Sequence, residues 1–349
     1  MPLQSISTEH FLHHNQERVL LDVRSPGEFE QAHIPGALNL PLFTNEERAE
    51  VGTLYKQDSP EKAFRHGIEI AGRKMGWYID TALLMAPNKK ITLHCWRGGK
   101  RSGSMAWLLD MAGFDVELLV GGYKAYRGYL HHYFETRTPH FIVVGGMTGS
   151  GKTYVLGELK NLGEQVIDLE DLAHHKGSAF GALGLEPQPT QEQFENDLFE
   201  VYRHLDKTKR IFIESESRKV GRCIIPEPIF TAMQSNMYIT YDCSMEQRIN
   251  HLVEQYGQFS FDELEASFNK IIKRLGYDQH KSAIEALQQN DLKEAARIAL
   301  IFYDKAYAHS VSLNPAPHKW HITETETDTR LIAQHIINSC NAFEKTNYV

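Results

Sequence analysis

Short apolar runs alternate with helix-like stretches along the first 140 residues of the chain. The runs with the length and branched residues of strands are RVLLDVR (18–24), HIPGALNLP (33–41), KKITLHC (89–95) and FDVELLV (114–120). Ser25 and Glu28 have the spacing of a capping box at a helix start, with Pro26 at the first helical position. Apolar residues recur at helical spacing from Ser102 to Ala112. Strands that alternate with helices predict an open, mostly parallel sheet.

The pattern begins again after ETRTPH (135–140), where an apolar run enters a glycine-rich loop. Further strand-like runs are QVIDLED (165–171), RIFIESES (210–217) and NMYITYDC (236–243). Thr190 and Gln193 have capping-box spacing, and helical apolar spacing dominates the last third of the chain. That helical spacing is seen at Phe194, Leu198, Val201 and Leu205, and again at Leu264, Phe268, Ile271 and Leu275. We therefore expect two α/β domains, residues 1–137 and residues 138–349, the second with a C-terminal helical region.

The composition narrows the class of protein. With 42% hydrophobic and 23% charged residues, the chain can bury sizeable cores, and no apolar run approaches the roughly 20 residues that span a bilayer. The first residues lack the basic and apolar regions of a signal peptide. A formal charge of −8 means that any nucleic-acid partner would need a local basic patch.

The cysteines and histidines argue against a disulfide framework and a metal site. The four cysteines form no C-x-x-C pair: Cys95, Cys223, Cys243 and Cys340. This scatter predicts a reducing, cytoplasmic location. The adjacent histidines at 13–14 and 174–175 do not share a helix face, so we predict no metal-binding pair there.

Cys95 lies in a cationic loop between a predicted strand and a predicted helix, in LHCWRGGKRSGSMAWLL (93–109). The loop residues are Trp96, Arg97, Gly98, Gly99, Lys100 and Arg101. Backbone N–H groups at a helix N-terminus bind anions, and nearby cations lower the pKa of a thiol. We therefore predict a nucleophilic thiolate in an anion-binding loop, rather than a structural cysteine that ends a strand.

The loop GGMTGSGKT (145–153) has the Walker A pattern between an apolar run and a helix-like stretch. The predicted phosphate contacts are Gly146, Gly149, Ser150, Gly151, Lys152 and Thr153. Backbone N–H groups would surround the phosphates, Lys152 would reach the outer phosphate oxygens, and the Thr153 hydroxyl could hold Mg²⁺. The strand RIFIESES has the weaker pattern of a Walker B strand, with Glu214 and Glu216 as candidate acids.

RNA binding would have to come from short basic runs and stacking side chains. The candidates are KTKR (207–210), SRKVGR (217–222), KIIKR (270–274) and Trp96. A short basic run is more often a solvated surface than an RNA site, so these runs alone do not establish a partner.

LLDVRSPGEFEQAHIPGALNLP (20–41) followed by HCWRGGKRS (94–102) resembles a rhodanese domain. The resemblance implies that Cys95 carries a terminal sulfur or selenium, with Trp96 to Arg101 as its anion-binding loop. Asp22, Arg24 and Glu28 would then stabilise the fold. HCWRGGKR also fits H-C-x5-R of cysteine-dependent phosphatases, some of which share the rhodanese fold, and loop length does not separate the two.

A rhodanese-like domain followed by a P-loop domain resembles the tRNA 2-selenouridine synthase family. Further matching stretches are TNEERAEVGTLYKQ (44–57), GGYKAYR (121–127), DLEDLAHHKGSAFG (168–181) and ESRKVG (216–221). The third would line the phosphate site, with Gly177 and Ser178 as contacts, and Arg218 would lie near the acids. Ser215 departs from the family pattern, in which we expect an acid; if that acid is the Walker B acid, metal assistance is in doubt here.

The resemblance implies a transferase that acts on wobble 2-thiouridine in tRNA. Sulfur would be replaced by selenium from selenophosphate, through an S-geranylated intermediate made from geranyl diphosphate, with that diphosphate in the Walker A loop. It implies no tightly bound cofactor, leaves Mg²⁺ open, and suggests a selenophosphate-producing enzyme as a partner. The alternatives are a rhodanese-fold phosphatase fused to an NTPase, and a nucleotide-gated sulfur carrier without RNA chemistry of its own.

Overall fold

A computed structural model describes residues 3–14, 17–137, 139–241, 243–313, 315–322 and 328–347, with backbone only at 310–313 and 346–347. The chain forms two compact units, Met1–Thr136 and Arg137–Val349. The sequence-based boundary between residues 137 and 138 lies one residue further on, and Thr138 itself is outside the described residues.

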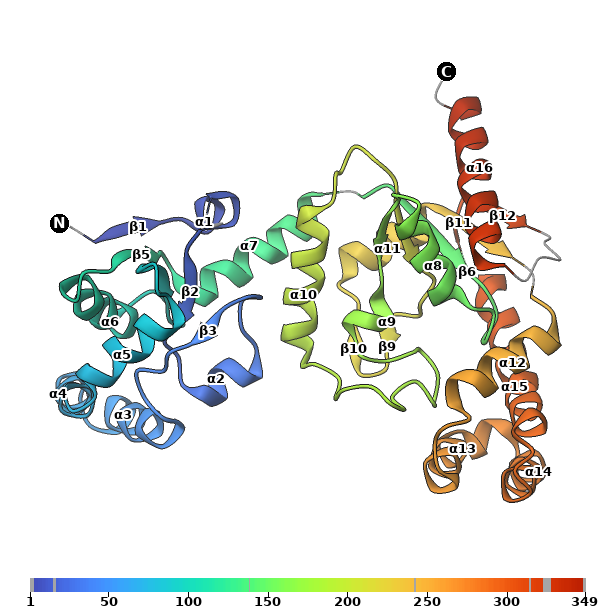
Figure 1. The fold of residues 1–349 in the computed structure, drawn as a ribbon, viewed down its shortest axis with the longest axis horizontal. Helices are drawn as coiled ribbons and strands as arrows, with labels where there is room; N and C mark the ends of the chain where they lie inside the picture. The colour runs from blue at the N-terminus through green and yellow to red at the C-terminus, as the bar shows by residue number, and fades with distance from the viewer. Residues whose placement is uncertain are drawn as a thin grey trace. The chain divides into compact units, whose positions relative to one another are not determined.

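The first unit is built on a five-stranded parallel sheet in the order β1-β5-β4-β2-β3 (Figure 1). Its strands are β1 (Gln4–Ile6), β2 (Val19–Asp22), β3 (Leu38–Asn39), β4 (Lys90–His94) and β5 (Asp115–Leu119). Its helices are α1 (Thr8–His14), α2 (Pro26–Gln31), α3 (Asn45–Gln57), α4 (Pro60–Gly72), α5 (Met75–Met85), α6 (Lys100–Met111) and α7 (Gly122–Thr136). The predicted parallel sheet is confirmed, as is the capping box of Ser25 and Glu28 on α2.

Strand β1 and helices α3, α4 and α5 were not predicted from the apolar pattern. Helix α3 has no buried residue, so its face carries no apolar period, and its start is set by Thr44, whose side chain accepts a hydrogen bond from the Glu47 N–H. Strand β1 buries only Ile6 of its three residues. Elements with so few buried side chains leave no periodic signal in the sequence.

The order of the strands places the cysteine loop at a topological switch point. From β2 the chain adds β3 on one side and β4, then β5, on the other, so the ends of β2 and β4 are neighbours where the direction reverses. Ligands of open parallel sheets bind at this position, beyond the carboxyl ends of the strands. Cys95 follows β4 directly, as the sequence predicts.

The second unit has a five-stranded parallel sheet in the order β12-β11-β6-β8-β7 and a small antiparallel pair, β9 with β10. Its strands are β6 (Phe141–Gly145), β7 (Gln165–Ile167), β8 (Ile211–Glu214), β9 (Lys219–Val220), β10 (Cys223–Ile224), β11 (Met237–Tyr241) and β12 (His318–Ile322). Its helices are α8 (Lys152–Asn161), α9 (Leu169–Leu172), α10 (Gln191–His204), α11 (Glu227–Ser235), α12 (Met245–Tyr256), α13 (Phe261–Leu275), α14 (Tyr277–Gln288), α15 (Leu292–Leu313) and α16 (Thr329–Asn347). Strand β12 was missed because four of its five residues are exposed.

Helices α12 to α15 form the helical region of the second unit. Figure 1 shows α13, α14 and α15 side by side, and α12 also packs on α15. Ser244 and Ser260 start α12 and α13 with complete capping boxes, and Leu264, Phe268 and Ile271 of α13 are buried as their spacing predicts. Within the described ranges, none of the helices combines the length and the apolar character that a membrane span requires.

Helix α7 holds the cysteine loop in place through its first N–H groups. The N–H groups of Tyr123 and Lys124 donate to the carbonyls of Cys95 and Trp96, each at 2.9 Å. Gly122 makes this approach possible, because it has φ +57° and a Cβ there would lie 2.2 Å from the Cys95 carbonyl oxygen. No side chain fits this position without a shift of the loop.

We predict that Gly122→Ala lowers the free energy of unfolding by about 2–4 kcal/mol, because both the left-handed φ and the carbonyl contact penalise a Cβ. Gly128→Ala is the matched control, since it lies on the same helix with open space around its Cα. That control should raise stability by about 0.5–1 kcal/mol. Chemical denaturation measures both, and equal stabilities of the two variants would contradict the account of this turn.

Candidate functional site

Cys95 begins the predicted anion-binding loop, with its thiol close to the first turn of α6. Its side chain is 3% exposed, and its Sγ lies 3.3 Å from the Ser102 Oγ, where either atom can donate. The single hydroxyl proton of Ser102 has a second acceptor within reach, the Gly99 carbonyl at 3.2 Å. Gly98 has φ +63°, which turns the loop sharply before the helix begins. The loop therefore brings the start of a helix to the sulfur.

The surroundings of Cys95 favour its thiolate form. Burial raises the pKa of the thiol, but hydrogen bonds from the side chain and backbone of Ser102, and the charge of Arg101, outweigh burial and lower the pKa overall. The other cysteines respond in the opposite direction, because burial raises the pKa of Cys223 and Cys243, and that of Cys340 to about 12. Cys95 is thus the thiol whose environment suits a nucleophile.

Of the three predicted cations, Arg101 is the one placed beside the thiol. Its two terminal nitrogens donate to the carboxylate of Glu28 at 2.6 and 3.2 Å, and Arg48 lies 3.6 Å from the same carboxylate. Arg97 and Lys100 are exposed, and the Lys100 ammonium lies over the Phe64 ring at 4.4 Å. The cationic character of the loop is therefore partly neutralised by Glu28.

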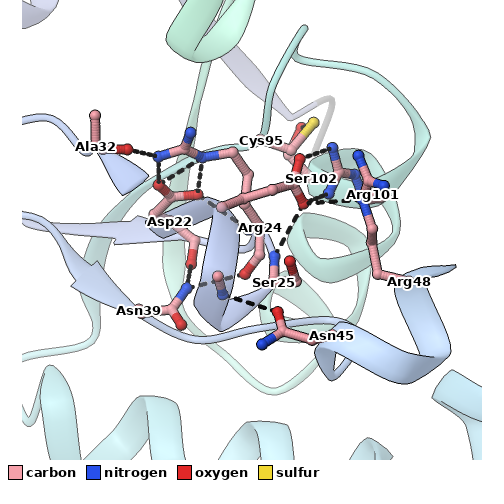
Figure 2. Close-up of polar contacts among 12 residues, drawn as sticks. Asp22, Arg24, Ser25, Ala32, Asn39, Asn45, Arg48, Cys95, Arg101 and Ser102 are labelled. Atoms are coloured by element: carbon pink, nitrogen blue, oxygen red, sulfur yellow. Dashed lines mark hydrogen bonds and ion pairs between the residues drawn. The ribbon is translucent and has the colours of Figure 1, made fainter. Parts of the chain in front are cut away.

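Asp22 and Arg24 form a buried ion pair beneath the cysteine loop, and Figure 2 shows this pair on one side of Cys95 with Arg101 on the other. Arg24 donates to the Asp22 carboxylate at 2.6–3.0 Å and to the Ala32 carbonyl at 2.7 Å. Its guanidinium lies 4.1 Å from the centre of the Tyr123 ring. The pair connects β2, α2 and α7, so we assign it to the fold of the site.

In the second unit, the Walker A residues adopt a tight loop between β6 and α8. Gly149 and Gly151 have φ +78° and +83°, and Lys152 Nζ donates to the Gly146 carbonyl at 3.1 Å. The Ser150 hydroxyl is buried without a hydrogen-bond partner among the described residues. A loop with positive-φ glycines and an unpartnered hydroxyl is suited to an oxyanion such as a phosphate.

Helices α12 and α15 fix this loop from outside. Arg248 of α12 is 2% exposed, donates to the Thr148 carbonyl at 2.8 Å and is paired with Asp304 of α15. His251 contacts the Gly149 carbonyl at 2.9 Å. A Cβ on Gly149 would lie 3.0 Å from the Arg248 carbonyl oxygen. The phosphate loop and the helical region therefore form one packed structure.

Four acids gather beside Lys152 and Thr153: Asp168, Glu170, Glu214 and Glu216. Thr153 Oγ1 donates to Glu170 at 3.3 Å, and the Glu170 N–H donates to the buried Glu214 at 2.5 Å. Burial and the other acids raise the pKa of Glu214 well above its ordinary value and that of Glu216 to about 8. In the described part of the chain, no three acid, histidine or cysteine side chains are arranged to hold a metal by themselves.

The remaining candidate residues do not all lie where the sequence predicts. Asp168 and Glu170, which were not singled out, follow the end of β7 in DLEDL, and their position after a strand was the signal available. Arg218 pairs with Glu227 of α11, and the Ser215 hydroxyl donates to Tyr238 at 3.0 Å. Arg218 therefore bonds to α11 and Ser215 to β11, rather than to the acid cluster, within the described residues.

In two of the three predicted basic runs, cationic side chains bond to other parts of the second unit. Lys207 donates to the carbonyls that end α10, Arg210 is paired with Glu164, and Arg222 donates to the Gln188 carbonyl. The run 270–274 on α13 instead has its lysines and Arg274 exposed. Trp96, 37% exposed, presents an aromatic ring at the cysteine loop.

Comparisons with known proteins agree with both units. Residues 9–129 match the rhodanese-like domain model, and residues 139–316 match the model described as the tRNA 2-selenouridine synthase AAA domain. The P-loop and rhodanese character predicted for the two domains is thereby confirmed.

Relatives named tRNA 2-selenouridine synthase come from several bacteria. The protein from Shewanella denitrificans is 34% identical over 85% of this chain and 89% of its own length. The protein from Ectopseudomonas mendocina is 35% identical over 80% of each chain. The protein from Nitrosomonas europaea is 37% identical over 68% of this chain and 63% of its own. The chain belongs to the tRNA 2-selenouridine synthase family.

Proposed function

We propose that this protein converts 2-thiouridine at the wobble position of tRNA into 2-selenouridine, the product for which its relatives are named. The observation that carries the proposal is that one chain holds two strand-to-helix loops suited to anions, one with the Cys95 thiol beside Ser102 and Arg101 and one with a Walker A lysine. One loop would serve the tetrahedral anion selenophosphate and the other the diphosphate of geranyl diphosphate.

The first step is alkylation of the thiocarbonyl sulfur at the Walker A loop. The sulfur attacks C1 of geranyl diphosphate, the C1–O bond breaks, diphosphate leaves, and N3 of the base loses its proton. Negative charge develops on the leaving diphosphate, and the loop N–H groups and Lys152 would stabilise it. Preformed donors of this kind typically contribute about 3–4 kcal/mol each to a transition state.

The acids beside the loop fit a divalent cation. The buried Glu214 Oε2 has no partner in the described part of the chain, and its neighbours are also acids. Mg²⁺ usually takes one or two protein carboxylates together with phosphate oxygens and waters. Thr153 and Glu170 are the side chains that would hold it, and the ion would neutralise charge on the diphosphate.

The second step replaces the geranylthiol by selenium, and Cys95 is proposed as its nucleophile. The thiolate attacks C2 of the base, the bond from C2 to the geranyl sulfur breaks, and geranylthiol leaves with a proton. Selenium of selenophosphate then displaces Cys95 from C2, and water hydrolyses the Se–P bond to phosphate. No oxidant is needed, whereas a selenosulfide on Cys95 would require one, because selenium in selenophosphate is already fully reduced.

The Glu28 pair disfavours the phosphatase alternative. In a cysteine-dependent phosphatase the arginine of H-C-x5-R has to face the bound phosphate, and here both terminal nitrogens of Arg101 donate to Glu28. For the tRNA partner, we propose that the exposed run 270–274 contacts phosphates and that Trp96 stacks on a base. A free thiol and a tRNA substrate are both consistent with the reducing cytoplasm.

We predict that the two loops fail at different steps. In thiolated tRNA incubated with both donors, Lys152→Ala should reduce geranyl transfer by about 100- to 1,000-fold, because it removes a charge from the leaving diphosphate. Cys95→Ala should leave geranyl transfer within about twofold of wild type and accumulate the S-geranyl nucleoside. Mass spectrometry of the digested nucleosides measures both products.

Matched controls are Lys160→Ala, at the exposed end of the same helix, and Cys243→Ala, a cysteine of raised pKa. Both should retain the full reaction. Loss of geranyl transfer in Cys95→Ala, with Lys152→Ala unaffected, would refute this assignment of donors to loops.

The lowered pKa of Cys95 predicts that its alkylation begins at lower pH than for an ordinary thiol. The thiolate fraction rises with pH through the pKa, so the half-maximal rate of alkylation by iodoacetamide should lie at a lower pH than for an ordinary cysteine thiol. Ser102→Ala removes the largest of the contributions that lower this pKa and should move that midpoint to higher pH. Ser104→Ala should leave it unchanged, because the Ser104 hydroxyl donates to the Lys100 carbonyl on the same helix. An unshifted midpoint in Ser102→Ala would contradict this account of the thiolate.

A further inference from the structure

An apolar chamber opens beside the Walker A loop, inside the helical region of the second unit. It has a volume of about 60 Å³. Its lining residues are Thr148, Ser178, Phe180, Leu252, Val253, Tyr256, Gly257, Leu264, Phe268, Leu287, Leu292, Ala295, Ala296, Ala299 and Tyr303. Protein cores contain few voids larger than a single water molecule. A cavity of this size beside a phosphate loop therefore indicates a ligand-binding site.

The chamber and the phosphate loop share their walls. Thr148 belongs to the Walker A loop and also lines the chamber. Arg248 of α12 holds the Thr148 carbonyl, and Leu252, one turn later on that helix, lines the chamber and would lie 3.2 Å from a Cβ on Gly149. A ligand with its phosphates on the loop could therefore extend into the chamber without leaving this unit.

The lining chemistry selects the class of ligand. Its polar groups are few, and two of them already bond within the protein: the Tyr303 hydroxyl accepts from the Ala179 N–H at 3.0 Å, and Ser178 Oγ accepts from the Phe180 N–H at 3.2 Å. A nucleobase buried there would leave its polar edge without partners, at a cost of about 1–3 kcal/mol for each unpaired group. A hydrocarbon chain has no polar groups that need hydrogen-bond partners, and its burial is favourable by about 0.8 kcal/mol for each CH₂.

We propose that this chamber binds the hydrocarbon tail of an isoprenoid diphosphate, with its diphosphate on the Walker A loop. The inference rests on the proposed function, in which geranyl diphosphate is the alkyl donor, and adds where the chain is recognised. A volume of about 60 Å³ corresponds to about four to six water-sized groups, which is the size of one five-carbon isoprene unit. The unit nearest the phosphates lies at Thr148, and the second unit fills the chamber.

Chain-length preference tests the proposal directly. Isothermal titration of the full chain with geranyl diphosphate, dimethylallyl diphosphate and inorganic diphosphate should give at least about tenfold tighter binding of geranyl than of dimethylallyl diphosphate, because only the longer chain reaches the chamber. Ala296→Leu, a half-buried lining residue of α15, should remove most of this preference. Its affinity for inorganic diphosphate should stay within about twofold, which also reports that the loop is folded.

Ala306→Leu is the matched control, an exposed alanine of the same helix that does not line the chamber, and it should behave as wild type. Leu252→Ala enlarges the chamber and should improve binding of the longer farnesyl diphosphate. An unchanged geranyl preference in Ala296→Leu, with diphosphate binding retained, would overturn the proposal and identify the chamber as a packing void.

The result separates this inference from the proposed function. If geranyl transfer to tRNA occurs but Ala296→Leu transfers geranyl as efficiently as wild type, the chamber assignment is wrong and the function stands. If geranyl preference follows the chamber variants but tRNA nucleosides never change, the chamber assignment stands and the function is wrong.

Discussion

Both candidate sites depend on the same constraint, the sharp turn by which a parallel strand passes into a helix. At that turn the backbone N–H groups of the first helical residues have no partners within the helix, and they point to where an anion can bind. Cys95 follows β4 in one unit, and the Walker A loop follows β6 in the other. The glycines at these turns allow the positive φ angles that a side chain would oppose.

In each unit a second helix fixes the shape of the loop. The N-terminus of α7 donates to the carbonyls of Cys95 and Trp96, and Arg248 of α12 donates to the Thr148 carbonyl. These contacts satisfy carbonyls that the tight loops would otherwise leave unpaired. They also connect each loop to elements far away in the sequence. The helical region of the second unit therefore fixes the shape of the phosphate loop and also lines the chamber beside it.

The two loops and the fold class could be predicted because their signals are local. A Walker A pattern after an apolar run, and a cysteine among glycines and cations, are each contained within ten residues. The pairing of Arg101 with Glu28 could not be predicted, because 73 residues separate them and only the sheet order brings them together. The same limit applies to the chamber, whose lining comes from six segments of the chain that no single periodicity links.

The central claim is that the P-loop alkylates the tRNA sulfur and Cys95 then exchanges it for selenium. The most direct measurement supplies tRNA that already carries S-geranyl-2-thiouridine, together with selenophosphate, to the two single variants. The account predicts that Lys152→Ala converts this tRNA to 2-selenouridine at close to the wild-type rate, since its missing step has been bypassed, while Cys95→Ala leaves the geranylated nucleoside unchanged. Conversion by Cys95→Ala at the wild-type rate, or none by Lys152→Ala, would contradict it.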